Sequence, residues 1–322
     1  MSVPVVQSAV FLDLDSIDRD DLDLSKLNAA VDNWEWHGLV QESELDQALA
    51  GADVVVSNKV LLSDEQLSKA RDLKLVCIAA TGANNIDLEA AARNNIAVCN
   101  VSGYATPSVV QHVFTLLLAL TTRFNEYTSA VKTGAWSRSN FFCLLDYPIR
   151  ELDGKTIGIV GYGHLGRAVA KVAEAFGMKV MLAKRNSEDQ RPGRIALHDL
   201  LPQVDMLSLH CPLTEETRGM IGADELALMK KDAVLINTAR GGLVDEDALL
   251  DALQTQQISG AGLDVLEKEP PPPGYPLLKV DLPNLIITPH TAWASRESRQ
   301  RLLDEIALNI EAFKAGELRN AV

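Results

Sequence analysis

The sequence is poor in cysteine. Its 322 residues include four cysteines, and no two of them stand in a C-x-x-C pair. This spacing disfavours a structural zinc site or a dithiol redox site, and we predict no metal site. Cys77 and Cys99 lie in apolar runs, so we expect buried free thiols at these two positions.

Positive charge is also scarce. The chain has 30 Lys and Arg against 44 Asp and Glu, which gives a net charge of −14. An acidic surface repels phosphate, so we expect no nucleic acid and no anionic membrane as a partner. The acidic excess otherwise serves solubility and carries no information about the fold. Any site for an anion must therefore be a local group of cations.

Long hydrophobic runs are absent. The most apolar helix candidate, residues 108–122, is too short and too polar to span a bilayer. The first residues, MSVPVVQSAVFLDLDS, lack a basic region and soon become acidic, so we expect no signal peptide and a cytoplasmic location by default. With 47% apolar and 23% charged residues, the composition is typical of a soluble globular protein, and the length predicts about two domains.

Short apolar runs alternate with helix-like stretches along the chain. Continuous apolar strands separated by helices indicate a parallel sheet that is covered on both faces. This rhythm runs through the first hundred residues and restarts at Lys155, so we predict an α/β fold with two doubly wound parallel sheets. The predicted strands are 9–14, 52–58, 73–80 and 96–101, then 155–161, 179–185, 204–211, 233–239, 259–265 and 284–290.

Two long helices are predicted outside these repeats. One covers Thr106 to Phe124 and lies between the two halves, with Pro107 at a position that favours a helix start. The other follows the last strand, with Ser295 as its N-cap and Gly316 as its terminator. This last helix could return to the first half and make the first domain discontinuous.

A glycine-rich turn follows the strand at 155–161. Gly161, Gly163 and Gly166 form a G-x-G-x-x-G pattern between a buried strand and a helix, which is the context that a dinucleotide-binding turn requires. The first glycine permits the tight turn, the second lets the backbone approach a pyrophosphate, and the third lets helix and strand pack closely. The helix start then offers free N–H groups to phosphate. The alternative is a glycine-rich turn without a ligand.

The strand at 179–185 ends in cations where NAD-binding chains usually carry an acid. Lys184 lies 23 positions beyond Gly161, where an acid would read the ribose 2′-hydroxyl. Lys184 and Arg185 would instead attract a 2′-phosphate, with Asn186 and Ser187 as neutral donors. We therefore predict NADP(H) as the preferred cofactor, with NAD(H) possible. The alternative is a solvated pair of basic residues.

Three polar residues follow apolar strands late in the chain: Arg240, Glu269 and His290. Ligands of open α/β sheets bind beyond the carboxyl ends of the strands, so all three can share one edge. Histidine can protonate the alkoxide that forms when hydride reaches a carbonyl carbon, and a nearby carboxylate favours the charged ring. Arginine can clamp a substrate carboxylate. Taken singly, each residue is more often structural or solvated.

These motifs together resemble those of the D-isomer-specific 2-hydroxyacid dehydrogenases, closest to the glycerate dehydrogenase and hydroxypyruvate reductase branch. The resemblance covers nearly the whole chain. It rests on TGANNIDLEAA, GKTIGIVGYGHLGRAVA, LHCPLTEETRGMI, LINTARGGLVDEDAL, GLDVLEKEPP and TPHTAWAS, in this order.

The resemblance implies a flavodoxin-like substrate domain, residues 1–101 and 291–322, and a Rossmann dinucleotide-binding domain, residues 102–290, in a homodimer. It places Arg240, Glu269 and His290 on the catalytic positions. The backbone of Gly82 and Ala83 would hold the substrate carboxylate, beside Arg240 and Trp293. The implied cofactor-binding residues are Gly161, Tyr162, Gly163, His164, Leu165, Gly166, Lys184, Arg185, Asn186, Cys211, Pro212, Thr217, Thr238, Ala239, Asp264 (towards the carboxamide) and His290.

The predicted reaction is the reduction of a small 2-oxoacid, hydroxypyruvate to D-glycerate or glyoxylate to glycolate, with the proton from His290. Lys184 departs from the acid that is common in the family, which puts NAD specificity in doubt. Two alternatives stay open. One is another D-2-hydroxyacid dehydrogenase, acting on 3-phosphoglycerate, D-lactate or 2-ketogluconate. The other is a dinucleotide-sensing, corepressor-like binding protein. Trp293 is either a pocket wall or a packed aromatic at a helix start.

Overall fold

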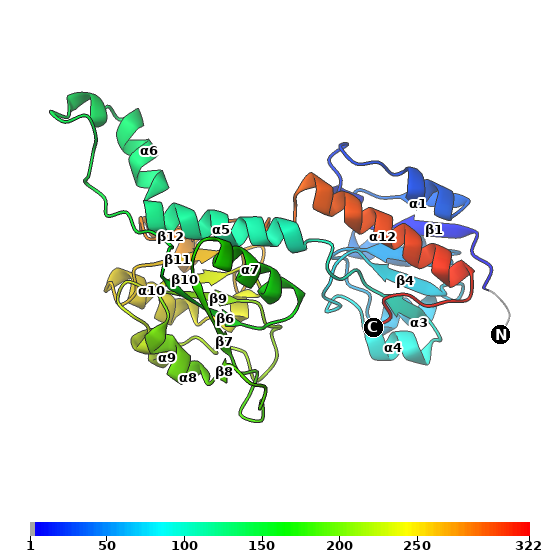
Figure 1. The fold of residues 1–322 in the computed structure, drawn as a ribbon. Helices are drawn as coiled ribbons and strands as arrows, with labels where there is room; N and C mark the ends of the chain where they lie inside the picture. The colour runs from blue at the N-terminus through cyan, green and yellow to red at the C-terminus, as the bar shows by residue number, and fades with distance from the viewer. Residues whose placement is uncertain (1–3) are drawn as a thin grey trace. The chain divides into compact units, whose positions relative to one another are not determined.

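The computed structural model describes residues 4–322, and the chain divides into two compact units. The first unit comprises Met1–Ala105 and Trp293–Val322, and the second comprises Thr106–Ala292 (Figure 1). Both units are built from parallel sheets covered by helices, so the predicted α/β class with two doubly wound sheets is confirmed. Within residues 4–322, no helix has the length and apolar character needed to cross a membrane.

The first unit contains a five-stranded parallel sheet in the order β2-β1-β3-β4-β5. This is the strand order of flavodoxin-like folds, in which ligands bind beyond the carboxyl ends of the strands. Its strands are β1 (Ser8–Phe11), β2 (Asn33–Trp36), β3 (Val54–Ser57), β4 (Leu75–Ile78) and β5 (Ala97–Cys99). Its helices are α1 (Ser25–Ala30), α2 (Leu45–Leu49), α3 (Asp64–Lys69), α4 (Leu88–Arg93) and α12 (Arg296–Lys314), with 3₁₀ turns η1 (Leu14–Ser16) and η2 (Glu42–Glu44).

The sequence predicts four of the five strands of this sheet: β1, β3, β4 and the edge strand β5. Every residue of β3 and β4 is buried, which explains their continuous apolar runs. Strand β2 was not predicted. It is an edge strand in which exposed and half-buried positions alternate, so only Trp34 and Trp36 face the apolar side and no apolar run marks it.

Helix α12 forms as predicted and packs on the core of the first unit. Ser295 Oγ accepts a hydrogen bond from the backbone N–H of Ser298 at 3.2 Å, and Gly316 follows the helix with φ of 82°. Leu302, Ile306 and Ile310 lie one turn apart and are fully buried in the core. The end of the chain thereby completes the first unit.

The second unit contains a seven-stranded parallel sheet in the order β12-β11-β10-β9-β6-β7-β8. Numbered from β6, this is the Rossmann order 3-2-1-4-5-6 with one more strand, and the order reverses beside β6. The strands are β6 (Thr156–Val160), β7 (Lys179–Ala183), β8 (Arg194–Ile195), β9 (Met206–Leu209), β10 (Val234–Asn237), β11 (Gly260–Leu263) and β12 (Leu285–Ile287). The six predicted strands are all present, while the two-residue β8 was not predicted.

Helices cover the second sheet. They are α5 (Thr106–Thr122), α6 (Phe124–Lys132), α7 (His164–Ala175), α8 (Leu197–Leu200), α9 (Ala223–Leu228), α10 (Glu246–Gln254) and α11 (Pro276–Lys279), with 3₁₀ turns η3 (Trp136–Arg138), η4 (Leu201–Gln203) and η5 (Gly241–Leu243). The predicted helix from Thr106 to Phe124 is wrong at its end: α5 stops at Thr122 because Arg123 adopts a left-handed conformation, with φ of 54°. Helix α6 then projects from the unit (Figure 1).

Candidate active site

The glycine-rich turn lies between β6 and α7, where the strand order reverses. A Cβ on Gly161 would lie 2.5 Å from the carbonyl carbon of His210, and one on Gly166 would overlap the carbonyl oxygen of Gly161. A Cβ on Gly163 would meet no atom within 4 Å. The first and third glycines are therefore required by packing, whereas the second leaves open space beside the backbone.

The start of α7 is suited to an anion. Its N-cap is Gly163, which has no side chain to accept from the first N–H groups of the helix. The helix begins with His164 and Leu165, and its 12 residues align their peptide dipoles towards the turn. This arrangement fits a pyrophosphate, as the motif predicts.

Lys184 and Arg185 lie directly beyond β7. The backbone of Lys184 donates to Ile195 at 2.8 Å, and the N–H of Arg185 donates to the carboxylate of Asp189 at 2.9 Å. Arg185 is exposed and Lys184 is half-buried. Within residues 4–322 neither side chain forms an ion pair, so both cations are available to an anionic ligand.

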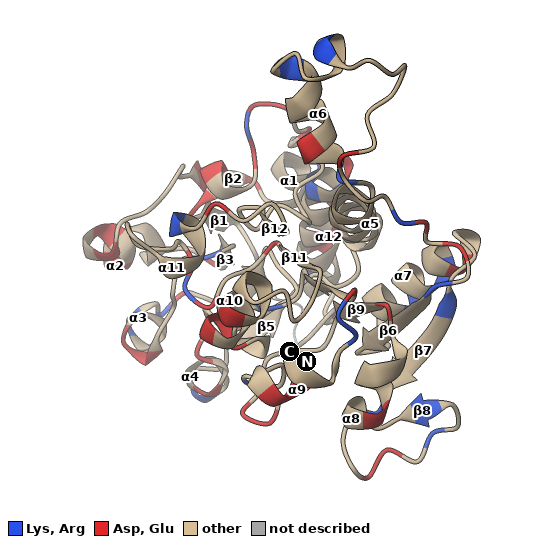
Figure 2. Cartoon of the chain, turned by 90° about the vertical axis from the view of Figure 1, so that its left-hand side faces the viewer, with Lys and Arg blue, Asp and Glu red and all other residues tan. Residues whose placement is uncertain are grey.

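The loop has two acids, Glu188 and Asp189, and the buried one, Asp189, is already engaged. Arg191 donates to it through Nε at 2.7 Å and Nη2 at 2.6 Å, and these bonds hold the pKa of Asp189 well below its usual range. A third cation, Arg194, was missed by the sequence analysis. Its guanidinium lies 5.0 Å from the ring centre of Tyr162 and donates to the carbonyl of Ala183 at 3.2 Å. Figure 2 shows this basic position on β8.

The structure joins two of the three predicted catalytic residues. His290 Nδ1 lies 2.6 Å from Glu269 Oε2, and the other oxygen of Glu269 accepts from the backbone of Leu266 at 2.8 Å. Each side chain is about one-third exposed. With an ionised Glu269 as acceptor, the proton of the ring lies on Nδ1, which fixes the tautomer of a neutral His290.

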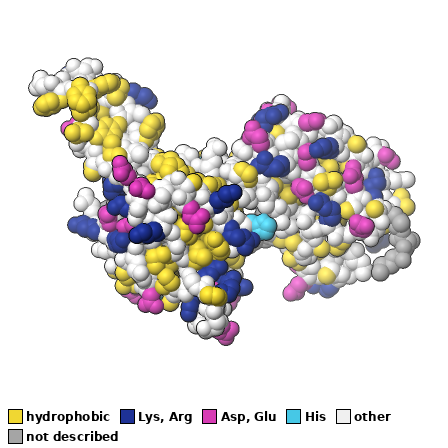
Figure 3. Space-filling view, in the orientation of Figure 1, with side chains coloured by type: hydrophobic (Ala, Val, Ile, Leu, Met, Phe, Trp, Pro, Cys, Tyr) yellow, Lys and Arg dark blue, Asp and Glu magenta, His cyan; other side chains and the backbone are white. Residues whose placement is uncertain are grey.

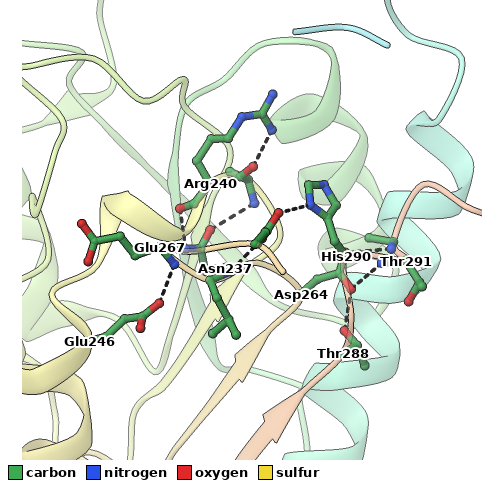
Figure 4. A network of polar contacts seen from close by, with 12 residues as sticks. Asn237, Arg240, Glu246, Asp264, Glu267, Thr288, His290 and Thr291 are labelled. Carbon is green, nitrogen blue, oxygen red and sulfur yellow. Dashed lines mark hydrogen bonds and ion pairs between the residues drawn. The ribbon is translucent and has the colours of Figure 1, made fainter. Parts of the chain in front are cut away.

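Arg240 lies beyond β10 and is exposed. Its Nη1 donates to the carbonyl of Ala239 at 2.6 Å, and its own carbonyl accepts from Asn237 Nδ2 at 2.8 Å. Figure 4 shows its side chain extending away from Asn237. The backbone of this loop is thus fixed, while the guanidinium is at the surface.

The turn that carries His290 is held by Asp264. The carboxylate of Asp264 is 1% exposed and accepts from the backbone of Thr291 at 2.9 Å, the backbone of Ala292 at 2.7 Å and the hydroxyl of Thr288 at 2.6 Å (Figure 4). His290 itself has φ of 53°, a conformation that non-glycine residues adopt only where neighbours enforce it. Asp264 therefore fixes the conformation of this turn through buried hydrogen bonds.

The other predicted cofactor residues line the ends of β9 and β10. The Thr238 hydroxyl is buried without a hydrogen-bond partner in the described chain, which fits a donor or acceptor on a ligand. Ala239 is also buried, and burial raises the pKa of the Cys211 thiol to about 11. Thr217 instead serves the loop itself, because its hydroxyl donates to the carbonyl of Pro212 at 2.8 Å.

The remaining predicted substrate residues belong to the first unit. Gly82 and Ala83 lie in the loop after β4, where the carbonyl of Ala83 accepts from Ile86 at 3.1 Å. Trp293 is half-buried and packs against the core of the first unit. Its predicted role as a pocket wall stays a prediction.

Comparisons with known proteins agree with this geometry. Residues 114–292 match the model of the D-isomer specific 2-hydroxyacid dehydrogenase NAD binding domain. A glycerate dehydrogenase of Methylorubrum extorquens is 44% identical over 318 residues, which is 99% of either chain. The chain belongs to the D-isomer-specific 2-hydroxyacid dehydrogenase family. The predicted membership and its glycerate dehydrogenase branch are thereby confirmed.

Two further proteins are similar to this chain over nearly its whole length. A hydroxypyruvate reductase of Blautia hydrogenotrophica is 37% identical over 319 residues, covering 97% of this chain and 98% of the relative. The solved structure of an acyclic imino acid reductase in complex with NADPH and D-Arg is 30% identical, covers 98% of this chain and 100% of its own, and has a TM-score of 0.86. This D-2-hydroxyacid dehydrogenase is therefore an oxidoreductase that uses a nicotinamide dinucleotide.

Sequence reasoning missed two polar residues of this dehydrogenase that support the His290 turn. His112 of α5 contacts Thr288 at 2.8 Å, and Ser108 donates to Ala292 at 2.6 Å. Both lie in a helix that the sequence predicts as mainly apolar. Their spacing of four residues, which places them on one helix face, is the signal that could have identified them.

Proposed function

We propose that this dehydrogenase reduces a small 2-oxoacid, hydroxypyruvate to D-glycerate and glyoxylate to glycolate. The observation that carries the proposal is the pair His290–Glu269, joined at 2.6 Å in the unit that contains the glycine-rich turn. The names of its relatives, glycerate dehydrogenase and hydroxypyruvate reductase, support the same substrate class.

In the proposed reaction the protein supplies the proton and the orientation of the substrate. A bound reduced nicotinamide would supply hydride to the 2-oxo carbon. His290 donates the Nε2 proton to the oxygen of the substrate, while Glu269 holds the ring by accepting from Nδ1. Arg240 orients the substrate by donating hydrogen bonds to its carbonyl and carboxylate, and the backbone N–H groups of Gly82 and Ala83 hold the carboxylate.

NADPH is the proposed preferred cofactor. Lys184 and Arg185 are cations without acid partners within residues 4–322, and the one buried acid of their loop, Asp189, is bound by Arg191. Both features favour a 2′-phosphate over a 2′-hydroxyl. The imino acid reductase that resembles this chain was solved with NADPH, which supports the same choice.

We further propose that residues 1–101 and 291–322 form the substrate domain, that residues 102–290 form the dinucleotide domain, and that two copies of the chain assemble. An exposed apolar arm supports the dimer. It comprises α6 and the following loop, with Phe141 76%, Phe142 91% and Leu145 83% exposed, and its apolar side chains gather at one end of the unit (Figure 3). A patch of this kind needs a partner surface. A cytoplasmic location stays a prediction.

The chemical role is tested by His290→Gln. Turnover of hydroxypyruvate should fall at least about 100-fold, the contribution of a general acid, while the Kd of NADPH changes little. His198→Gln is the matched control, because His198 also pairs with a glutamate, Glu225 at 2.8 Å, but on the surface. Undiminished turnover in His290→Gln would refute the role. A panel of 2-oxoacids with both reduced cofactors separates the alternatives, and oxidation of neither cofactor would favour a sensor.

The cofactor preference is tested by Lys184→Asp. The ratio of kcat/KM for NADPH to that for NADH should fall about 10- to 100-fold, because a charge-assisted contact to phosphate is replaced by repulsion. Lys171→Asp, an exposed cation on α7, is the control for net charge. A wild-type enzyme that uses NADH better, or a ratio that Lys184→Asp leaves unchanged, contradicts the proposal.

The proposed dimer contact is tested by Phe142→Asp. This variant should convert a dimer to monomer in light scattering, and an unchanged mass would exclude the arm as the dimer contact.

A further inference from the structure

Helix α5 contacts both ends of the turn that carries His290, at Thr288 and at Ala292. Ser108 Oγ donates to the carbonyl of Ala292 at 2.6 Å, and His112 Nε2 lies 2.8 Å from Thr288 Oγ1. Residues four apart lie on the same face of a helix, so both contacts come from one face of α5. The turn between Thr288 and Ala292 is thus clamped against a single helix.

Glycines in β11 allow this approach. A Cβ on Gly262 would lie 3.0 Å from the Cβ of Leu116 and 2.9 Å from Cδ1 of Ile236, and one on Gly260 would lie 3.3 Å from a methyl group of Leu120. Both leucines belong to α5, so the absence of side chains on β11 lets the helix lie close to the sheet. Asp264, immediately beyond β11, is therefore within reach of α5.

The hydrogen bonds of Asp264 determine which group donates and which accepts in the contacts that join His112, Thr288 and Asp264. An ionised carboxylate only accepts, so the single hydroxyl proton of Thr288 points to Asp264 Oδ1 at 2.6 Å. Thr288 Oγ1 must then accept from His112, which requires the proton of His112 on Nε2. The same nitrogen lies 3.4 Å from Asp264 Oδ1, and the side chain of His112 is 18% exposed.

The chain of bonds ends at the catalytic turn. Asp264 accepts from the backbone N–H groups of Thr291 and Ala292, the two residues after His290. His290 is held at φ of 53° between these bonds and its own N–H bond to the carbonyl of Thr288 at 3.0 Å. A shift of Thr288 or Asp264 therefore changes where the imidazole of His290 points.

We propose that His112 is a positioning residue for the reaction: through Thr288 and Asp264 it sets the orientation of His290. The inference rests on the proposed role of His290 as proton donor. His112 itself need not touch the substrate or the cofactor. Its contribution is the Nε2–H donor, which keeps the Thr288 hydroxyl directed at Asp264.

The test compares His112→Leu with His112→Gln, whose Nε2 can still donate to Thr288. We expect kcat with hydroxypyruvate to fall about 10- to 100-fold in His112→Leu, as for a small misplacement of a reacting group, with the Kd of the cofactor changed less than about threefold. His112→Gln should recover kcat to within about fivefold of wild type. His198→Leu, which removes a surface histidine, should leave kcat unchanged.

A second readout separates positioning from damage to the fold. A misplaced proton donor slows the chemical step, so the primary deuterium isotope effect on kcat should rise in His112→Leu. Loss of folded enzyme alone lowers kcat and leaves this isotope effect as it is. If His112→Leu does not fold, Thr288→Val removes the same link, and where both fold the double variant should lose no more than the worse single variant.

The outcomes are distinct. The proposal is overturned if His112→Leu keeps kcat within twofold, if His112→Gln is as impaired as His112→Leu, or if kcat falls with an unchanged isotope effect. His290→Gln, assayed beside them, identifies a failure of the proposed function: turnover retained in that variant removes the proton-donor role itself. Loss of turnover in His290→Gln with full activity in His112→Leu removes only the positioning role.

Discussion

Replacing Gly163 or Gly166, the second and third glycines of the turn, by alanine should have different effects. The first change should weaken cofactor binding, and the second should lower the stability of the fold. Gly163 has φ of −80° and ψ of −154°, which alanine can adopt, and a Cβ there would meet no atom within 4 Å. Gly166 lies in α7, where a Cβ would overlap the carbonyl oxygen of Gly161. One change fills open space beside the backbone, and the other forces the strand and helix apart.

The magnitudes follow from these surroundings. Alanine at Gly166 gains about 1 kcal/mol of helix propensity but introduces overpacking against backbone, which costs about 1–3 kcal/mol or more, so we expect a net loss of stability. Each kcal/mol lowers Tm by about 2–4 °C in a domain of this size. Alanine at Gly163 should change the free energy of unfolding by less than about 0.5 kcal/mol.

Binding should show the opposite order. If the pyrophosphate lies against the backbone at Gly163, a methyl group there costs at least one charge-assisted hydrogen bond, about 1.5–3 kcal/mol. This corresponds to a Kd for NADPH raised about 10- to 150-fold. The assay is thermal and urea unfolding of the ligand-free variants, followed by fluorescence titration of each with NADPH. A Gly163→Ala variant that binds NADPH like wild type would refute the placement of the pyrophosphate, and a fully stable Gly166→Ala would refute the steric reading.

Two other properties follow from titratable groups that are partly shielded from solvent. Burial lowers the pKa of His210 from 6.5 to about 4. Between these pH values the imidazole is protonated in the unfolded chain but not in the folded one. About 3 kcal/mol of stability that is present at neutral pH should therefore be lost as the pH falls through this range. Urea unfolding from pH 7 to 4 should therefore show a shallower decline for His210→Gln than for wild type. Because burial raises the pKa of Cys211 to about 11, iodoacetamide at pH 8 should label Cys211 slowly in the native protein and rapidly in urea, as read by mass spectrometry.

Much of the fold follows from local patterns in the sequence. The inner strands are predictable because burial on both faces demands continuous apolar runs, as in β3 and β10. The ends of α12 are predictable because Ser295 and Gly316 act through their own backbone neighbourhood. Strands β2 and β8 are not predicted, since no apolar run marks them: β2 alternates exposed and half-buried positions, and β8 has only two residues. The interruption between α5 and α6 at Arg123 is not predictable either, because no glycine or proline marks that position.

The candidate site divides in the same way. His290 and Glu269 are found from sequence because each follows an apolar strand, and parallel strands bring their carboxyl ends to one edge. His112 is not, because it lies within an apolar helix and its partner Thr288 is 176 residues away. The contact depends on how closely α5 packs on β11, which is a property of tertiary structure and not of any local pattern.

Two buried acids of this chain have similar structural roles and opposite implications for ligands. Asp264 bonds to the backbone after β11 and fixes a turn that presents His290, and Asp189 bonds to the backbone after β7 and fixes a turn that presents Arg185. An acid near the ribose of a dinucleotide would ordinarily argue for NADH. Asp189 is bound through two nitrogens of the Arg191 guanidinium and is only 8% exposed, so it can act on the loop but is not a partner for a hydroxyl. Asp189 therefore does not oppose a 2′-phosphate, because its charge is compensated by Arg191 before any ligand binds.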